Sequence, residues 1–116
     1  MLSATNLITN QINSAQVETE IYLINMNILS YVAQIPYTGP NVTTVDANTV
    51  TMVNNVEVTG TPLTLDSDYY GVWQGTLGNT YKFKEMQTVI DYYTKLGYTI
   101  SRKSADGVSL YWLIGW

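Results

Sequence analysis

The segment 80–116 constrains the fold most, because its hydrophobic period changes from that of a helix to that of a strand. Gly97 marks the change and can end a helix in the left-handed conformation without steric cost. After Gly97 apolar residues alternate with others at 98–101 and again at 108–116, which predicts strands over 98–103 and 108–115 with a turn at Ala105-Asp106-Gly107. Before it, apolar side chains share one helical face: Met86, Val89, Ile90, Tyr93 and Leu96.

The same pattern predicts the centre of the hydrophobic core. The apolar face of the helix and the inner face of the hairpin should pack against each other, because both would otherwise be exposed to water. We therefore expect the following side chains to be mostly buried and in mutual contact: Met86, Val89, Ile90, Tyr93, Ile100, Leu110, Trp112 and Ile114.

The first 36 residues are predicted to be helical. A weak pattern predicts a short helix over 2–15, and a second helix is expected from Ser14, as its N-cap, to Pro36. Glu18 and Glu20 would lie near the positive end of the second helix. Its apolar side chains form two lines, which indicates burial on two sides, by the sheet and by either the first helix or another subunit. The lines are Val17, Ile21, Ile24, Ile28, Tyr31 and Ile35, and Tyr22, Met26 and Leu29.

The middle of the chain is predicted to hold a β-hairpin and a capped helical turn. Apolar residues alternate over 49–53 and 56–59, and Asn54-Asn55 between them tolerates the positive φ of a two-residue turn. Val42–Val45 is a candidate edge strand. Asp66-Ser67-Asp68 favours a helix cap over a cation site, since no closing acid follows at the spacing of a metal loop.

The chain after this cap contains the only glycine cluster, Gly71, Gly75 and Gly78. Its spacing fits neither a dinucleotide fingerprint nor a phosphate loop, so we expect flexible points of a turn. Leu63 and Leu65 should anchor the chain before the cap. Together the segments predict one α+β domain over 1–116, with two N-terminal helices, an antiparallel sheet with hairpins, and a C-terminal helix followed by a hairpin. Its parts are 1–36 (helical), 37–79 (β-hairpin and capped turn) and 80–116 (helix plus β-hairpin).

The composition argues against several classes of function. The net charge is −4 and the five basic residues are not clustered, which disfavours nucleic acid as a partner. The chain has no Cys and no His, so disulfides and thiolate metal sites are excluded and the commonest general base is missing. No apolar run is long enough to span a membrane, and the start does not resemble a signal peptide. We expect no cofactor, no metal and no membrane partner, and synthesis inside a cell.

Candidate functional residues follow from the remaining features. Only 12% of the residues are charged and 12% are aromatic, which favours neutral contacts with other proteins. The second helix supplies the candidate interface of a homo-oligomer: Ile21, Tyr22, Met26 and Leu29. The alternative is a binding module in which aromatic side chains hold a peptide or carbohydrate: Tyr69, Tyr70 and Trp73.

An enzyme is not expected. The acids considered for catalysis are Glu18, Glu20, Asp66, Asp68, Glu85 and Asp91. Paired-carboxylate hydrolysis needs two acids on opposite sides of a cleft, and the neighbouring pairs in this set are too local for that arrangement. The sequence therefore favours a structural or binding role over catalysis.

The segments DYYGVWQGTLGN, EMQTVIDYYTKLGYTISRK and SLYWLIGW together resemble small uncharacterised proteins of marine T4-like phages, cyanophages in particular. The shared features are a Tyr-Tyr/Phe-x-Val-Trp segment at 69–73, a helix ending in Leu-Gly-Tyr at 96–98, and a closing Trp116. The resemblance covers the chain from Leu65 onwards, whereas the hairpin around Asn54-Asn55 departs from it in length. It implies a phage origin and a structural or virion-assembly role beside other phage structural proteins, with the protein in the host cytoplasm during synthesis and then in the virion. It assigns no functional residues.

Overall fold

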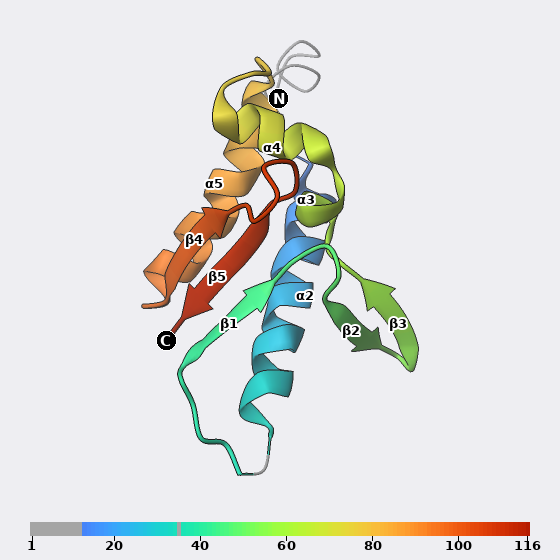
Figure 1. Cartoon of the computed structure of the whole chain (residues 1–116), viewed down its shortest axis with the longest axis vertical. Coiled ribbons are helices and arrows are strands. Elements are labelled where there is room, and N and C mark those ends of the chain that lie inside the picture. The colour runs from blue at the N-terminus through green and yellow to red at the C-terminus, as the bar shows by residue number, and fades with distance from the viewer. Residues whose placement is uncertain (1–12, 35) are drawn as a thin grey trace, which may run out of the picture.

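The computed structural model describes residues 13–34 and 36–116, and this part combines helices with antiparallel strands (Figure 1). The predicted α+β class is confirmed. The predicted helix over 2–15 falls, up to residue 12, outside the described residues. The helices are α2 (Ser14–Val32), α3 (Pro62–Leu65), α4 (Ser67–Gln74) and α5 (Thr80–Lys95). The strands are β1 (Val42–Val45), β2 (Val50–Val53), β3 (Val56–Thr59), β4 (Thr99–Lys103) and β5 (Tyr111–Gly115).

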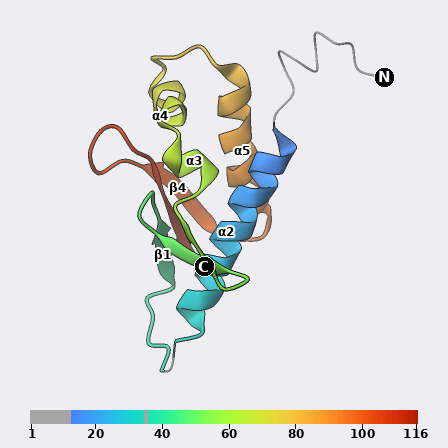
Figure 2. The same ribbon diagram turned by 90° about the vertical axis from the view of Figure 1, so that its right-hand side faces the viewer.

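The main sheet has three antiparallel strands in the order β1-β5-β4. Helices α2 and α5 lie next to each other on one side of it, as the turned view shows (Figure 2). In the central strand β5, Trp112 and Ile114 are buried while Tyr111 and Leu113 between them are only half-buried. This alternation is the pattern of a sheet with one face on the core. The candidate edge strand β1 is confirmed, since it pairs only with β5 in the described residues.

The core fills the space between this sheet and the helices, as the sequence predicted. Ile90 and Ile100 are partly buried and pack against it, and the other members of the predicted set are buried. Leu96 is different: it is 58% exposed, because α5 ends at Lys95 and Leu96 is already its C-cap. Gly97 then has a φ of 90°, as expected for a residue that closes a helix.

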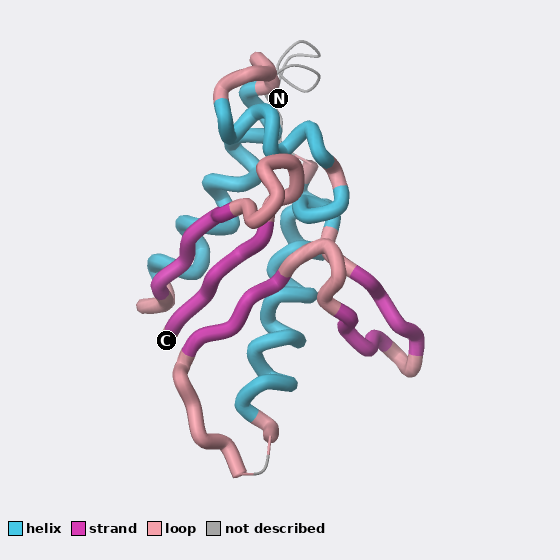
Figure 3. The backbone as a smooth tube through the Cα atoms, in the orientation of Figure 1, coloured by secondary structure: helices cyan, strands magenta, loops and turns pink. Residues whose placement is uncertain are grey.

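The β2–β3 hairpin forms a separate two-stranded sheet that projects from the body of the molecule (Figure 3). Asn54 and Asn55 have φ values of 52° and 65°, so the predicted two-residue turn is confirmed. A single sheet was expected, and the hairpin instead stands apart from the main one. Gly60, with a φ of 73°, directs the chain from β3 into α3.

Helix α2 differs from the prediction at both ends. Its N-cap is Asn13, whose side chain accepts a hydrogen bond from Gln16 N at 3.1 Å, and Ser14 is the first helical residue. The helix ends at Val32, several residues before Pro36, with Ala33 as its C-cap. Glu20 lies beyond the first turn and is buried, so it does not complement the positive end of the helix.

The connection from β3 to α5 contains two short helices. The predicted cap is confirmed, because the Asp66 side chain accepts a hydrogen bond from Asp68 N at 2.9 Å at the start of α4. Leu63 is buried and Leu65 is 61% exposed, so only Leu63 anchors the chain. Of the three glycines, Gly71 lies within α4 rather than in a turn, and Gly75 ends α4 in the left-handed conformation.

Candidate functional site

Glu20 is a fully buried carboxylate at the junction of α2, α3 and β5. Its Oε2 atom accepts hydrogen bonds from Thr61 Oγ1 at 2.6 Å and from Trp112 Nε1 at 2.7 Å. Its Oε1 atom accepts one from Leu63 N at 2.9 Å. Burial raises the pKa of the Glu20 carboxyl above its usual range, and the three hydrogen bonds offset part of that rise.

Glu85 is the second buried carboxylate, and it joins α5 to α4 and to the start of α2. Its Oε2 atom accepts a hydrogen bond from the Tyr69 hydroxyl at 2.6 Å, and its Oε1 atom accepts one from Asn13 N at 3.1 Å. Burial, together with the hydrogen bond to Glu85 and the charge of Glu85, raises the pKa of Tyr69. The Tyr69 hydroxyl also lies 3.1 Å from Gln16 Oε1.

Lys82 extends this second cluster towards the surface. Its ammonium group lies 4.4 Å from the centre of the Tyr69 ring and forms ion pairs with Asp66 and Asp68. Partial burial acts to raise the pKa of Asp66, but the hydrogen bonds from Lys82 and Asp68 N and the charge of Lys82 outweigh it. The net pKa of Asp66 is therefore lowered.

The carboxylates of Glu20 and Glu85 are closed to a substrate. Glu20 is fully buried, and Glu85 and Tyr69 are each 1% exposed. A general acid or base must lie within hydrogen-bond reach of the reacting group, which no external molecule achieves here without opening the core. The arrangement instead ties helices together, since each carboxylate bonds donors from two other segments. Of the other acids considered for catalysis, Glu18 and Asp91 are exposed.

Sequence spacing held a signal for both buried acids. Glu20 lies three residues after Val17 and four before Ile24, on the buried face of α2. Glu85 lies four residues before Val89 on the buried face of α5. A carboxylate in the middle of an apolar face predicts a buried, hydrogen-bonded group.

The predicted aromatic surface is only partly present. Tyr69 lies in the core, because its ring packs among buried side chains and its hydroxyl bonds Glu85, and this removes it from any exposed surface. Tyr70 is half-buried and Trp73 is 37% exposed, with ring centroids 5.5 Å apart. The sequence analysis missed a second aromatic cluster. In it, the ring centroid of Tyr31 lies 5.7 Å from that of Trp116 and 5.8 Å from that of Tyr37.

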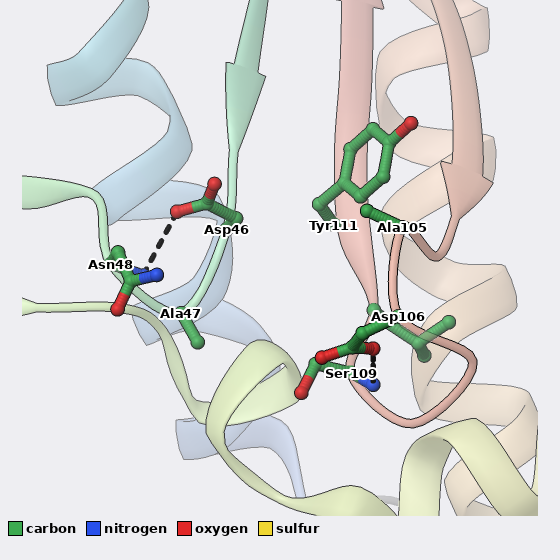
Figure 4. A pocket seen from close by; sticks show the side chains of 8 residues that line it. Asp46, Ala47, Asn48, Ala105, Asp106, Ser109 and Tyr111 are labelled. Atoms are coloured by element: carbon green, nitrogen blue, oxygen red, sulfur yellow. Dashed lines mark hydrogen bonds between the residues drawn. The ribbon is translucent and has the colours of Figure 1, made fainter.

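A cavity of about 150 Å³ lies between the β1–β2 loop and the β4–β5 connection (Figure 4). Asp46 and Asp106 line its two sides. The Asp46 carboxylate accepts a hydrogen bond from Asn48 N at 2.8 Å, and the Asp106 carboxylate accepts one from Ser109 N at 2.7 Å. Hydrogen bonds from the backbone N–H groups of Ser109 and Val108 lower the pKa of Asp106. Both carboxylates therefore shape their own loops, and their presence here is explained without a ligand.

The outward face of α2 carries an uncharged stripe with large apolar side chains. Its residues are spaced alternately by four and three, which is the heptad spacing that lets helices pair. Tyr22 and Leu29 are 48% and 60% exposed, and Met26 between them is half-buried. Ile21, in contrast, is partly buried and packs against the core, on another side of the helix from Tyr22 and Leu29. We call this surface the α2 stripe: Ala15, Thr19, Tyr22, Met26, Leu29 and Ala33.

Within 13–34 and 36–116, no three His, Cys, Asp or Glu side chains gather as they would around a metal ion. None of the helices in that part has the length and apolar character needed to cross a membrane. Comparison of the chain with protein-family models, curated proteins and solved structures found no match.

Proposed function

We propose that the protein is a non-enzymatic structural or assembly protein that acts as a homo-oligomer through the α2 stripe. The observation that carries the proposal is the exposure of Tyr22 and Leu29 on the face of α2 opposite the core. An exposed apolar surface with heptad spacing favours pairing with another helix. Following the resemblance of 65–116 to phage proteins, we propose that the assembly belongs to a phage virion or to its construction.

Charge on α2 favours an antiparallel pair of helices. The helix contains no basic residue, and its only acids are Glu18, which is exposed, and Glu20, which is buried. A parallel pair would bring two Glu18 side chains and two like helix ends together. An antiparallel pair separates them and opposes the two helix dipoles. The two-fold axis of such a pair is the commonest symmetry of soluble oligomers.

The alternative of an aromatic binding module keeps only Tyr70 and Trp73 as its support, because Tyr69 is buried. Two rings at 54° to each other offer less surface to a sugar or peptide than the three that the sequence suggested. The α2 stripe is the longer continuous surface, since 19 helical residues span ~28 Å. We therefore favour self-association.

Light scattering on the full chain tests the proposal. We expect a mass of at least twice the 13.0 kDa of one chain at micromolar concentration. Leu29→Glu and Tyr22→Glu should each restore the monomer, because two-fold symmetry places two new charges in the interface. Thr80→Glu is the matched control: it makes the same change of charge at an exposed position at the start of α5, where an acid suits the helix dipole.

Two outcomes would contradict the proposal. A wild-type mass of 13.0 kDa at every dilution would refute self-association. An oligomer that Thr80→Glu disrupts as strongly as Leu29→Glu would show a general effect of charge, and would remove α2 from the interface. Circular dichroism of each variant checks that the helices remain folded.

A further inference from the structure

The outer edge of β3 presents unpaired backbone groups. Val53 and Val56 flank the hairpin turn and face each other across the ladder. At the other end of the hairpin, Gly60 N donates a hydrogen bond to Thr49 O at 2.7 Å. In an antiparallel ladder the hydrogen-bonded pairs alternate, so Glu57 and Thr59 turn their N–H and C=O groups away from β2. Within the described residues, β3 pairs with β2 alone.

This edge lacks the features that usually block strand pairing. Natural edges carry lysines, prolines, bulges or inward-pointing charges. Edge strand β4 follows that rule with Arg102 and Lys103. Strand β3 has Glu57 as its only charge, and the hairpin exposes apolar side chains: Val50 at 52%, Met52 at 51% and Val56 at 62%. A two-stranded sheet is also only marginally stable without a further strand or other packing.

We propose that β3 pairs antiparallel with β3 of a second copy, about a two-fold axis at Val58, to form one four-stranded sheet across two subunits. Isologous pairing of this kind needs no other partner, because each edge offers the backbone N–H and C=O groups that bond those of the other edge. Glu57 and Thr59 form two hydrogen-bonded pairs with the partner's Thr59 and the partner's Glu57. Val58 faces the partner's Val58 in the non-hydrogen-bonded pair between them.

Charge and burial select this register over its neighbours. An axis at Glu57 would place two carboxylates directly opposite each other, which destabilises a sheet. An axis at Thr59 would pair Glu57 with the partner's Thr61, and Thr61 is buried at the start of α3. Only the axis at Val58 pairs every outward backbone group and sets each Glu57 opposite a neutral threonine.

This pairing is independent of the α2 stripe, and it extends the proposed assembly. Three residues from each subunit bury less surface than a standard interface, so the contact alone is weak. In a closed assembly that also uses the α2 contact, the last β3 contact joins copies that are already linked, so it is effectively intramolecular and strengthens the assembly by avidity. A subunit with two separate two-fold contacts can build a chain of copies or a closed assembly of dihedral symmetry.

Single-cysteine variants test the pairing, because the natural chain has no Cys and any disulfide must join two copies. Val58→Cys should form a covalent dimer on mild oxidation, since facing residues of a non-hydrogen-bonded pair bring their Cβ atoms within disulfide reach. Val56→Cys is the matched control: it lies on the same strand and is more exposed, but with the axis at Val58 it lies opposite residue 60 of the partner subunit, about four residues along the ladder from its counterpart.

Glu57→Pro in the Val58→Cys background makes the test specific to the edge. Proline removes an outward N–H group and leaves the bonds between β2 and β3 intact, so cross-linking should fall to the level of Val56→Cys. Equal cross-linking at 56 and 58, no cross-linking at 58, or a yield unchanged by Glu57→Pro would each overturn the proposal. Tyr22→Glu in the same background separates it from the α2 interface, because residual cross-linking at Val58 then reports the β3 contact alone.

Discussion

Glu20→Gln tests whether the buried carboxylate ties the fold together as its hydrogen bonds indicate. A carboxyl group, charged or neutral, can accept from Leu63 N and Trp112 Nε1 together, because each of its oxygens keeps a free lone pair. The glutamine amide has one oxygen, so its NH₂ group must face either Leu63 N–H or Trp112 Nε1–H. The Thr61 hydroxyl avoids the conflict by rotating towards Thr64 Oγ1, 2.9 Å away.

One fixed donor therefore loses its partner in the core. Leaving a buried donor unsatisfied costs ~1–3 kcal/mol, which is a large share of the ~5–15 kcal/mol that stabilises a typical domain. Trp112→Phe removes one of the two competing donors. The double variant Glu20→Gln/Trp112→Phe should consequently lose less free energy of unfolding than the sum of the single variants.

The loss of unfolding free energy caused by Glu20→Gln should depend on pH in a definite direction. Because burial raises the folded pKa of Glu20, the folded protein binds more protons than the unfolded chain above about pH 4.5. The stability contributed by neutral Glu20 is then complete below that pH and is lost as the pH rises through the folded pKa. Glutamine does not titrate, so the cost of Glu20→Gln should shrink as the pH rises.

Urea denaturation followed by circular dichroism, at a series of pH values, measures both effects. A cost that grows with pH would show that the folded pKa of Glu20 is lowered. Additivity of Glu20→Gln and Trp112→Phe within ~0.5 kcal/mol would show that Trp112 Nε1 and Glu20 are not coupled.

Two further predictions concern packing and the turn. Trp112→Ala should cost ~3–5 kcal/mol in the same urea assay, because Trp112 is 2% exposed in the core, and a loss below ~1 kcal/mol would contradict this placement. Asn55→Ala should cost ~1 kcal/mol because alanine resists the φ of 65°, whereas Asn55→Gly should not, and equal thermal stability of the two variants would refute a turn with positive φ.

The secondary structure was predictable from the sequence at positions where one or two residues set the local backbone conformation. The asparagine pair fixed the β2–β3 turn, Gly97 fixed the end of α5, and Asp66 fixed the start of α4. The core side of β5 followed from strict alternation around Trp112. Each of these features depends on a few neighbouring residues and on their allowed backbone angles.

Features that depend on residues distant in the sequence were harder to predict from the sequence. Tyr69 was expected on the surface, and its burial rests on Glu85, which comes from a different helix. The isolation of the hairpin depends on how β1, β4 and β5 pair, and alternation within β2 and β3 holds no information on that pairing. The exposure of Leu29 on α2 likewise depends on which face of the helix the sheet covers.

The buried acids also change how the surface charge should be counted. The sequence has nine acidic and five basic residues, and burial of Glu20 and Glu85 leaves seven acidic side chains against the five basic ones. Of the basic ones, Arg102 points under α5 and is half-buried, and burial lowers its pKa to about 10. Fewer acidic side chains therefore face solvent than the count from the sequence suggests. The charge is also sparse where association is proposed, since the α2 stripe has none and β3 has only Glu57. Because these contact surfaces are nearly neutral, association should depend little on salt, in contrast to an assembly held by ion pairs.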